Sequence, residues 1–213
     1  EAALRDDCGF IGHLPYWNWE LDWEDVTKAP VWGGQHSFGS NGNPKSGESI
    51  VKGYCATDGP FQNFKIPYLD EEYYPHCLSR GFATREELAT QAEMLRPERI
   101  ERLMGMSNYN SFNLGLEDGP HVAIPRSIRG DFSMQTAPSD PVFFLHHTQL
   151  GRLWWKWQRA EYVGHKMRYE GLTAHKSTER ASTNDLLSMG GLAADAQVSR
   201  ILDTEGGFLC YRY

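Results

Sequence analysis

Two adjacent histidines, His146 and His147, lie in an apolar stretch and indicate chemistry most directly. Adjacent side chains on a helix point about 100° apart, so only one of the two can face the core. The apolar register of the stretch places His147 on the core face, together with Phe143, Leu150 and Trp154. A histidine aimed into an aromatic interior needs a hydrogen-bond partner or a metal ion. His147 is therefore a candidate metal ligand.

A third histidine, His121, lies four residues after the carboxylate of Glu117. It ends the segment LEDGPH. This arrangement suits a metal-bound water held between an imidazole ligand and a carboxylate base. The same residues are also compatible with a solvated turn that carries an ion pair. Spacing alone leaves both interpretations open.

Helices are the elements expected to position these residues. Thr84 with Glu87 three residues later is a capping-box signal, and the apolar residues that follow recur at helical spacing. Pro97 predicts that this helical region is split in two.

A further helix is predicted to begin at Asp140, with Pro141 at the first helical position, and to reach about Gln158. The predicted core face of this helix contains positions 143, 144, 147, 150, 154 and 157. Gly151 lies inside the helix, where it costs about 1 kcal/mol relative to alanine, so a local reason for it is expected.

Residues 1–70 are rich in glycine, proline, asparagine and aspartate, which favours loops over long helices. The segment also carries tryptophan, tyrosine and phenylalanine side chains at a density that a flexible linker would not have. We therefore expect an ordered loop region that packs on the core.

Composition limits the class of protein. The 213 residues include 27 aromatic side chains and carry a formal charge of −7, from 21 Lys and Arg against 28 Asp and Glu. Phosphate binding needs clustered cations, which the sequence lacks, so a nucleic-acid partner is not expected. No apolar run approaches the roughly 18 residues of a membrane span. These features predict a soluble globular protein without a membrane segment.

Four cysteines, Cys8, Cys55, Cys77 and Cys210, are spread along the chain without a CxxC pair. This spacing is not typical of a structural zinc site, and the even number favours two disulfides over four buried thiols. Cys55 and Cys77 flank a short segment that a disulfide would close, but all three pairings stay open. Oxidised cysteines would indicate a compartment outside the cytosol.

Several segments together resemble the tyrosinase and catechol oxidase family, the type-3 copper polyphenol oxidases, and especially its short fungal members. PYWNW at residues 15–19 is similar to a PYWDW segment of the family, and LEDGPH at 116–121 to the opening of its second copper site. SDPVFFLHH at 139–147, with RLW at 152–154, resembles the family's paired-histidine helix. Similar loops occur at 37–42, 58–61 and 77–82, and 204–213 resembles the closing tyrosine motif.

The resemblance implies a mainly α fold, a helical bundle of the tyrosinase type with extensive ordered loops. It implies a secreted enzyme that uses dioxygen and two copper ions to oxidise o-diphenols to o-quinones, with monophenol hydroxylation in some members. His121 matches the first ligand of the second copper and His147 the third. Glu117 matches a glutamate that positions a water near the copper. Met134 and Phe143 are expected to form the substrate gate.

Three departures from the family pattern stand out. Pro125 occupies the position of the second ligand, four residues after His121, and proline cannot bind copper. Gly151 replaces an aspartate that would anchor Arg152 or a histidine. The first copper site lies upstream of the PYWDW segment in the family, whereas only 14 residues precede Pro15 here.

Residues 1–213 are accordingly expected to be the C-terminal part of a tyrosinase-like catalytic domain, from the second copper region to the closing tyrosine motif. A separate N-terminal fragment would then carry the first copper. The alternatives are a degenerate, non-catalytic homologue and a single-metal protein in which His146, His36 or His76 replaces a ligand. The isolated chain is expected to show no catechol oxidation above that of free copper, because too few ligands match.

Overall fold

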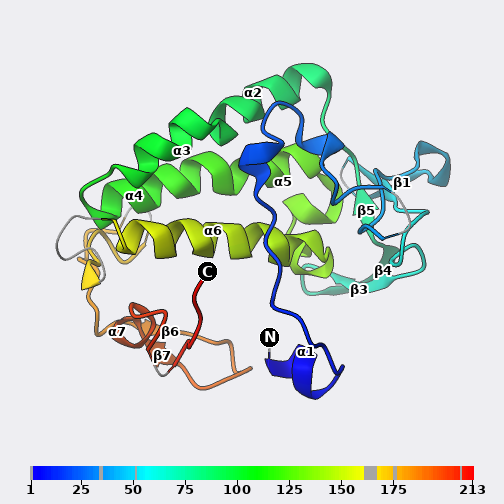
Figure 1. Cartoon of the computed structure of the whole chain (residues 1–213). Helices are drawn as coiled ribbons and strands as arrows, with labels where there is room; N and C mark the ends of the chain where they lie inside the picture. Colours follow the sequence, from blue (N-terminus) through cyan, green and yellow to red (C-terminus); the bar gives the residue numbers. More distant parts are fainter. Residues whose placement is uncertain (1, 34–35, 51, 161–166, 175–176, 207) are drawn as a thin grey trace. The chain divides into compact units, whose positions relative to one another are not determined.

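The computed structural model describes residues 2–33, 36–50, 52–160, 167–174, 177–206 and 208–213 (Figure 1). The chain divides into two compact units. The first unit contains residues 1–99 and 119–150, and the second contains residues 100–118 and 151–213. The α-helices are α1 (Ala2–Asp6), α2 (Arg85–Leu95), α3 (Pro97–Met104), α4 (Tyr109–Leu116), α5 (Val122–Ile128), α6 (Val142–Gln158) and α7 (Val198–Ile201). The mainly α prediction is confirmed.

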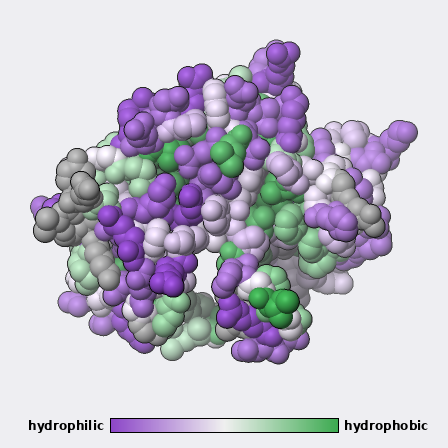
Figure 2. Space-filling view, viewed as in Figure 1, coloured by the Kyte–Doolittle hydropathy of each residue, from purple (hydrophilic) through white to green (hydrophobic). Residues whose placement is uncertain are grey.

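Helix α2 begins and ends where the sequence predicts. The Thr84 hydroxyl accepts a bond from the Glu87 amide, and the Glu87 carboxylate accepts one from the Thr84 amide, which completes the capping box. The helix stops at Leu95, and α3 begins at Pro97. Within the first unit α2 packs on α5, and its outward residues are hydrophilic, as the purple surface over α2 in Figure 2 shows.

Short strands, which the sequence did not indicate, complete the first unit. They are β1 (Glu48–Ile50), β2 (Gly53–Cys55), β3 (Lys65–Leu69), β4 (Glu72–Cys77) and β5 (Ser79–Arg80). They form an antiparallel sheet in the order β1-β2-β5 and a separate β3-β4 hairpin. Tyr54 lies opposite Arg80 in the first, and Ile66 lies opposite His76 in the second.

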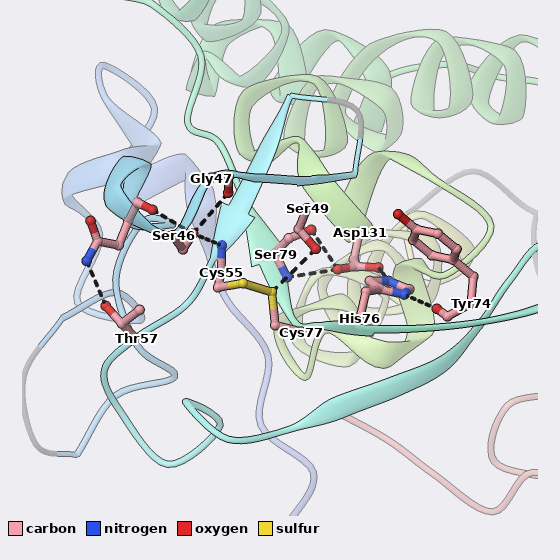
Figure 3. The surroundings of a disulfide bond; sticks show 11 residues. Ser46, Gly47, Ser49, Cys55, Thr57, Tyr74, His76, Cys77, Ser79 and Asp131 are labelled. Atoms are coloured by element: carbon pink, nitrogen blue, oxygen red, sulfur yellow. Dashed lines mark hydrogen bonds and ion pairs between the residues drawn. A yellow bond between two sulfur atoms is a disulfide. The ribbon is translucent and has the colours of Figure 1, made fainter.

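One disulfide ties these strands together. Cys55 at the end of β2 is bonded to Cys77 at the end of β4 (Figure 3). Cys8 and Cys210 are exposed free thiols, so the expectation that all four cysteines are oxidised is wrong for this pair. The cross-link joins residues that are 22 positions apart in the loop-rich region and so restricts the unfolded chain there.

The loop-rich region of residues 1–70, which we call the aromatic loop, packs inward, as expected. Its helical turns are single 3₁₀ turns at η1 (Trp19–Leu21), η2 (Val26–Lys28) and η3 (Pro44–Ser46). Trp17, Trp19 and Trp32 are buried, and the Trp17 and Trp32 rings meet edge to face at 5.6 Å. These side chains give a segment without long helices a core of its own.

The second unit is organised around Trp157 near the end of α6. Its ring stacks on Phe112 of α4 at 4.7 Å, and its indole nitrogen donates to the Met106 carbonyl. Strands β6 (Leu186–Leu187) and β7 (Ala196–Gln197) pair beside α7. A Cβ atom at Gly151 would lie 3.1 Å from the Tyr213 hydroxyl, so the glycine lets the closing tyrosine motif approach α6 closely.

No described helix combines the length and the apolar character that a bilayer crossing requires.

Candidate metal centre

The start of α6 is fixed by a buried ion pair. Asp140 accepts a bond from the Val142 amide at 3.0 Å and so caps the helix, as predicted. Its two carboxylate oxygens also accept from Arg80 Nε at 2.7 Å and Nη2 at 2.9 Å. Both side chains are fully buried. The bidentate geometry fixes the helix that carries His146 and His147.

Arg80 uses its remaining donor group on the aromatic loop. Nη1 donates to the carbonyls of Phe38, Gly39 and Ser40 at 2.9–3.2 Å. The guanidinium also lies over the Trp32 ring at 4.7 Å. A single buried arginine therefore joins strand β5, the loop and the start of α6.

The predicted core face of α6 is wrong by about one residue. The buried positions are 142, 145, 146, 149, 153, 157 and 158. His146 is fully buried, His147 is half-buried, and Phe144 is 49% exposed. Three polar residues occupy the buried face because partners are available there. Gln149 donates to Asn18 at 2.8 Å, Gln158 donates to the Leu202 carbonyl at 2.7 Å, and His146 donates to a backbone carbonyl.

Three histidine side chains gather at this end of α6, and we call His121, His146 and His147 the histidine pocket. The ring centres of His121 and His147 are 5.3 Å apart and nearly perpendicular. His146 lies 5.9 Å from His121 in a parallel orientation and 5.0 Å from His147. The structure thus brings together the two histidines that the resemblance selects as copper ligands, and it adds a third.

Hydrogen bonds orient two of the three rings. His147 Nδ1 donates to the Phe143 carbonyl at 2.9 Å, a bond that leaves the lone pair of the ring on Nε2. His146 Nε2 donates to the backbone carbonyl of His121 at 3.1 Å. His146 Nδ1 is buried and has no hydrogen-bond partner among the described residues. Burial holds the pKa of His146 well below its usual value, with smaller contributions from His147 and His121, so the ring is neutral.

Aromatic side chains enclose the pocket. Phe143 stacks on His147 with 3.9 Å between ring centres. Trp19 lies 6.4 Å from His146, and Phe132 lies 6.1 Å from it. Phe143 is thus in contact with a candidate ligand, as a gate residue would be. The gate role of the half-buried Met134, which follows the turn η5 (Gly130–Ser133), stays a prediction.

The backbone around His121 is irregular. His121 ends η4 (Glu117–His121), a π-helical turn that kinks at Gly119 before α5 begins. Glu117 is exposed at the first position of this turn, and its role near a metal stays a prediction. Pro125 lies inside α5, where it offers no side-chain ligand.

The residues present fit a copper site incompletely. Copper is well matched to imidazole, and His121 and His147 converge. No group of three histidine, cysteine or acidic side chains within the described part of the chain is arranged to hold a metal ion. His146 is turned to the His121 carbonyl, and Pro125 stands where a third imidazole is expected.

The other histidines considered as substitutes lie elsewhere. His76 uses both ring nitrogens, one near Asp131 at 2.9 Å and one near the Tyr74 carbonyl at 2.7 Å. His36 is exposed in a turn. Sequence reasoning missed the buried polar residues Arg80 and Asp131, because their partners lie at least 40 residues away in the chain.

A family sequence profile described as "Common central domain of tyrosinase" matches residues 1–160. The chain belongs to the tyrosinase family. It is 41% identical to the tyrosinase-like protein phomQ1' of Diaporthe leptostromiformis, and it is 37% identical to the tyrosinase ustQ of Aspergillus flavus. Both alignments cover the whole chain, which spans 61% and 60% of these relatives.

The fold has a solved counterpart in the same family. A polyphenol oxidase of Thermothelomyces thermophila, solved as the mutant G292N, matches with a TM-score of 0.80 and 26% identity. The match covers 100% of this chain and 69% of that one. The tyrosinase-type fold predicted from the paired-histidine helix is therefore confirmed. The family implies copper and an oxidase chemistry, and the chain spans about three fifths of the curated relatives above.

Proposed function

We propose that the protein oxidises phenolic small molecules with dioxygen, and that this chain supplies the second-copper half of a binuclear copper centre. One observation carries the proposal. The ring centres of His121 and His147 lie 5.3 Å apart within an aromatic pocket, in a chain of the tyrosinase family. The proposed substrates are o-diphenols, which would be converted to o-quinones. Monophenol hydroxylation is a further expectation.

The residues of the pocket suit a phenol as substrate. The Phe143 ring presents an aromatic surface against which a flat phenol can stack, and it lies on His147. Conversion of a diphenol to a quinone removes two electrons and two protons, which dioxygen receives. Glu117 is proposed to accept the first of these protons from the phenolic hydroxyl. Copper, once bound, would supply the electron transfer to dioxygen.

The number of copper ligands in this chain indicates what a partner region would have to supply. Six imidazoles would serve two copper ions, three for each, and this chain converges two at matching positions. We therefore propose that the first copper is carried by an N-terminal region, which in the family lies upstream of the PYWDW segment. The chain spans only about three fifths of these relatives, which leaves room in them for a further region.

A second candidate function is a homologue that keeps the scaffold and binds one metal ion or none. Pro125 in place of a ligand favours it, because it leaves the His121 side of the pocket one imidazole short. Metal content separates the two candidates.

Secretion is proposed as the location. The Cys55–Cys77 disulfide supports it, because disulfides persist mainly in oxidising compartments.

The experiment uses two preparations, the 213-residue chain and the native gene product, each loaded with copper and desalted. Copper stoichiometry, the absorption spectrum after addition of hydrogen peroxide, and oxidation of catechol are measured. Intact mass shows whether a second polypeptide accompanies the native preparation. We expect two coppers and saturable oxidation in the native product, and no oxidation above that of free copper in the chain alone.

Two variants make the test specific. His147→Ala is expected to abolish oxidation in the native product, whereas His36→Ala, which removes an exposed histidine, leaves it unchanged. Equal activity in His147→Ala and the parent protein would refute the proposed site. One copper or none in the native product would support the non-catalytic alternative.

A further inference from the structure

The turn η5 lies against strand β5, and the backbone at its start has a conformation that is energetically unfavourable for most residues. Arg129 and Gly130 both have positive φ angles, +60° and +56°. A Cβ atom at Gly130 would lie 2.3 Å from the Ser79 carbonyl oxygen, so only glycine allows this approach. A non-glycine residue such as Arg129 adopts positive φ only where the surroundings enforce it. Something must therefore hold the turn in place.

The side chain of Asp131, the second residue of the turn, makes the bonds that hold it. Asp131 is fully buried, and its Oδ2 accepts from both the amide and the hydroxyl of Ser79 at 2.8 Å. Its Oδ1 lies 2.9 Å from His76 Nε2. Figure 3 shows the carboxylate between Ser79 on β5 and His76 on β4. Both oxygens are thus bonded to the strands.

His76 is bonded to the protein through both of its ring nitrogens. Its Nδ1 lies 2.7 Å from the Tyr74 carbonyl, which can only accept, so Nδ1 carries a hydrogen. The Asp131 carboxylate accepts two bonds from Ser79 and lies 2.9 Å from His76 Nε2. The disulfide at Cys77, the next residue, anchors this histidine from the other side.

The residue after Asp131 reaches the histidine pocket. The ring of Phe132, fully buried, is 6.1 Å from His146 and 6.3 Å from Phe143. His146 in turn donates to the backbone carbonyl of His121. A shift of η5 would uncover the His146 ring and loosen the bond that fixes His121.

We infer that Asp131 is a positioning residue of the histidine pocket: bonded to His76 and Ser79, it fixes η5 so that Phe132 covers His146 and His146 can hold His121 in place. The consequence for oxidation rests on the proposed function, whereas the geometry itself is independent of copper. The pocket is therefore held partly from outside, by the bonds of Asp131 in η5 to His76 on β4 and Ser79 on β5.

The test observes His146 directly in the metal-free, ¹⁵N-labelled chain. Long-range ¹H–¹⁵N spectra of the imidazoles identify the neutral Nε2–H form of His146. The rate at which that proton exchanges with solvent measures how well Phe132 shields the ring from water. In Asp131→Asn, which keeps the shape and removes the charge, we expect exchange to become about ten times faster, as for the loss of one hydrogen bond. The ¹⁵N shift of His76 Nε2 should change as well, because its partner at position 131 is no longer a carboxylate.

A matched control separates positioning from general stability. Val198→Ala, in the second unit, removes buried apolar contacts and lowers Tm but is expected to leave His146 exchange unchanged. Should Asp131→Asn fail to fold, Ser79→Ala removes only the hydroxyl bond and should give a smaller acceleration, about threefold. Wild-type exchange at His146 in a folded Asp131→Asn or Ser79→Ala chain would overturn the inference. Acceleration together with an inactive native product would overturn only the proposed function.

Discussion

The first unit buries two kinds of polar cluster, and they differ in how completely their atoms are bonded. In the Arg80–Asp140 and His76–Asp131 pairs, every charged group has acceptors or donors from the protein. In the histidine pocket, His146 Nδ1 is buried without a described partner. Fully bonded buried charges hold a fold in one arrangement, whereas a buried polar atom without a partner calls for a separate explanation. The contrast predicts different responses to substitution.

The largest effect is expected from the Arg80–Asp140 pair. Arg80→Met leaves the Asp140 carboxylate buried without its counter-charge, which should lower the free energy of unfolding by about 3–5 kcal/mol. Urea denaturation measures this loss. The double variant Arg80→Met/Asp140→Asn should recover part of it, because no uncompensated charge remains. A change in the free energy of unfolding of only about 0.5 kcal/mol in Arg80→Met is typical of surface sites. Such a result would show that this pair stabilises the fold no more than the histidine pocket does.

The disulfide beside His76 should have the next largest effect. Replacing both Cys55 and Cys77 by serine is expected to lower the free energy of unfolding by about 2–4 kcal/mol, because the unfolded chain gains freedom. Replacing the exposed thiols Cys8 and Cys210 by serine is the control and should change stability little. Equal effects of the two double variants in thermal unfolding would contradict the pairing.

In the histidine pocket, we expect substitution to change copper affinity more than it changes stability. His147→Ala removes a half-buried ring and should change the free energy of unfolding by only about 1 kcal/mol. Copper affinity of the native product, measured by competition with a chromogenic chelator, should fall more than about tenfold, an effect of the size expected when a ligand or its support is lost. A large stability loss with unchanged copper affinity would place His147 with the structural clusters.

The smallest effect concerns the exposed end of α2. The Arg129 guanidinium, with the Thr84 amide and hydroxyl, lowers the pKa of Glu87 from its usual value to about 2. A carboxyl group with a lowered pKa in the folded state contributes stability above its unfolded pKa, near 4.5, and this contribution disappears as pH falls towards about 2. Glu87→Gln should therefore flatten the fall in stability over this range. A parallel pH profile would contradict the bond to Arg129.

The helix boundaries were predictable because their signals are local. The capping box at Thr84, the break at Pro97 and the cap at Asp140 each involve residues within four positions of one another. The small strands were not predictable, since two-residue segments such as Ser79–Arg80 pair only when distant chain segments meet.

The candidate site was predictable only through the family resemblance. The apolar residues at 143, 150 and 154 set a register that placed His147, not His146, on the core face. The buried face of α6 instead contains His146 and Gln149, which are stabilised by partners more than 20 residues away. No periodicity in the local sequence reports such partners.

Arg80 also has a consequence for the folding pathway of the first unit. Its bonds reach partners 40 to 42 residues away in the loop and 60 residues away at the start of α6. A guanidinium that enters the core before these acceptors arrive would lose its hydration without compensation. We therefore expect the three segments to come together in one late step that spans long loops, because contacts of such sequence separation slow folding. The first unit should accordingly refold slowly and as a single cooperative body.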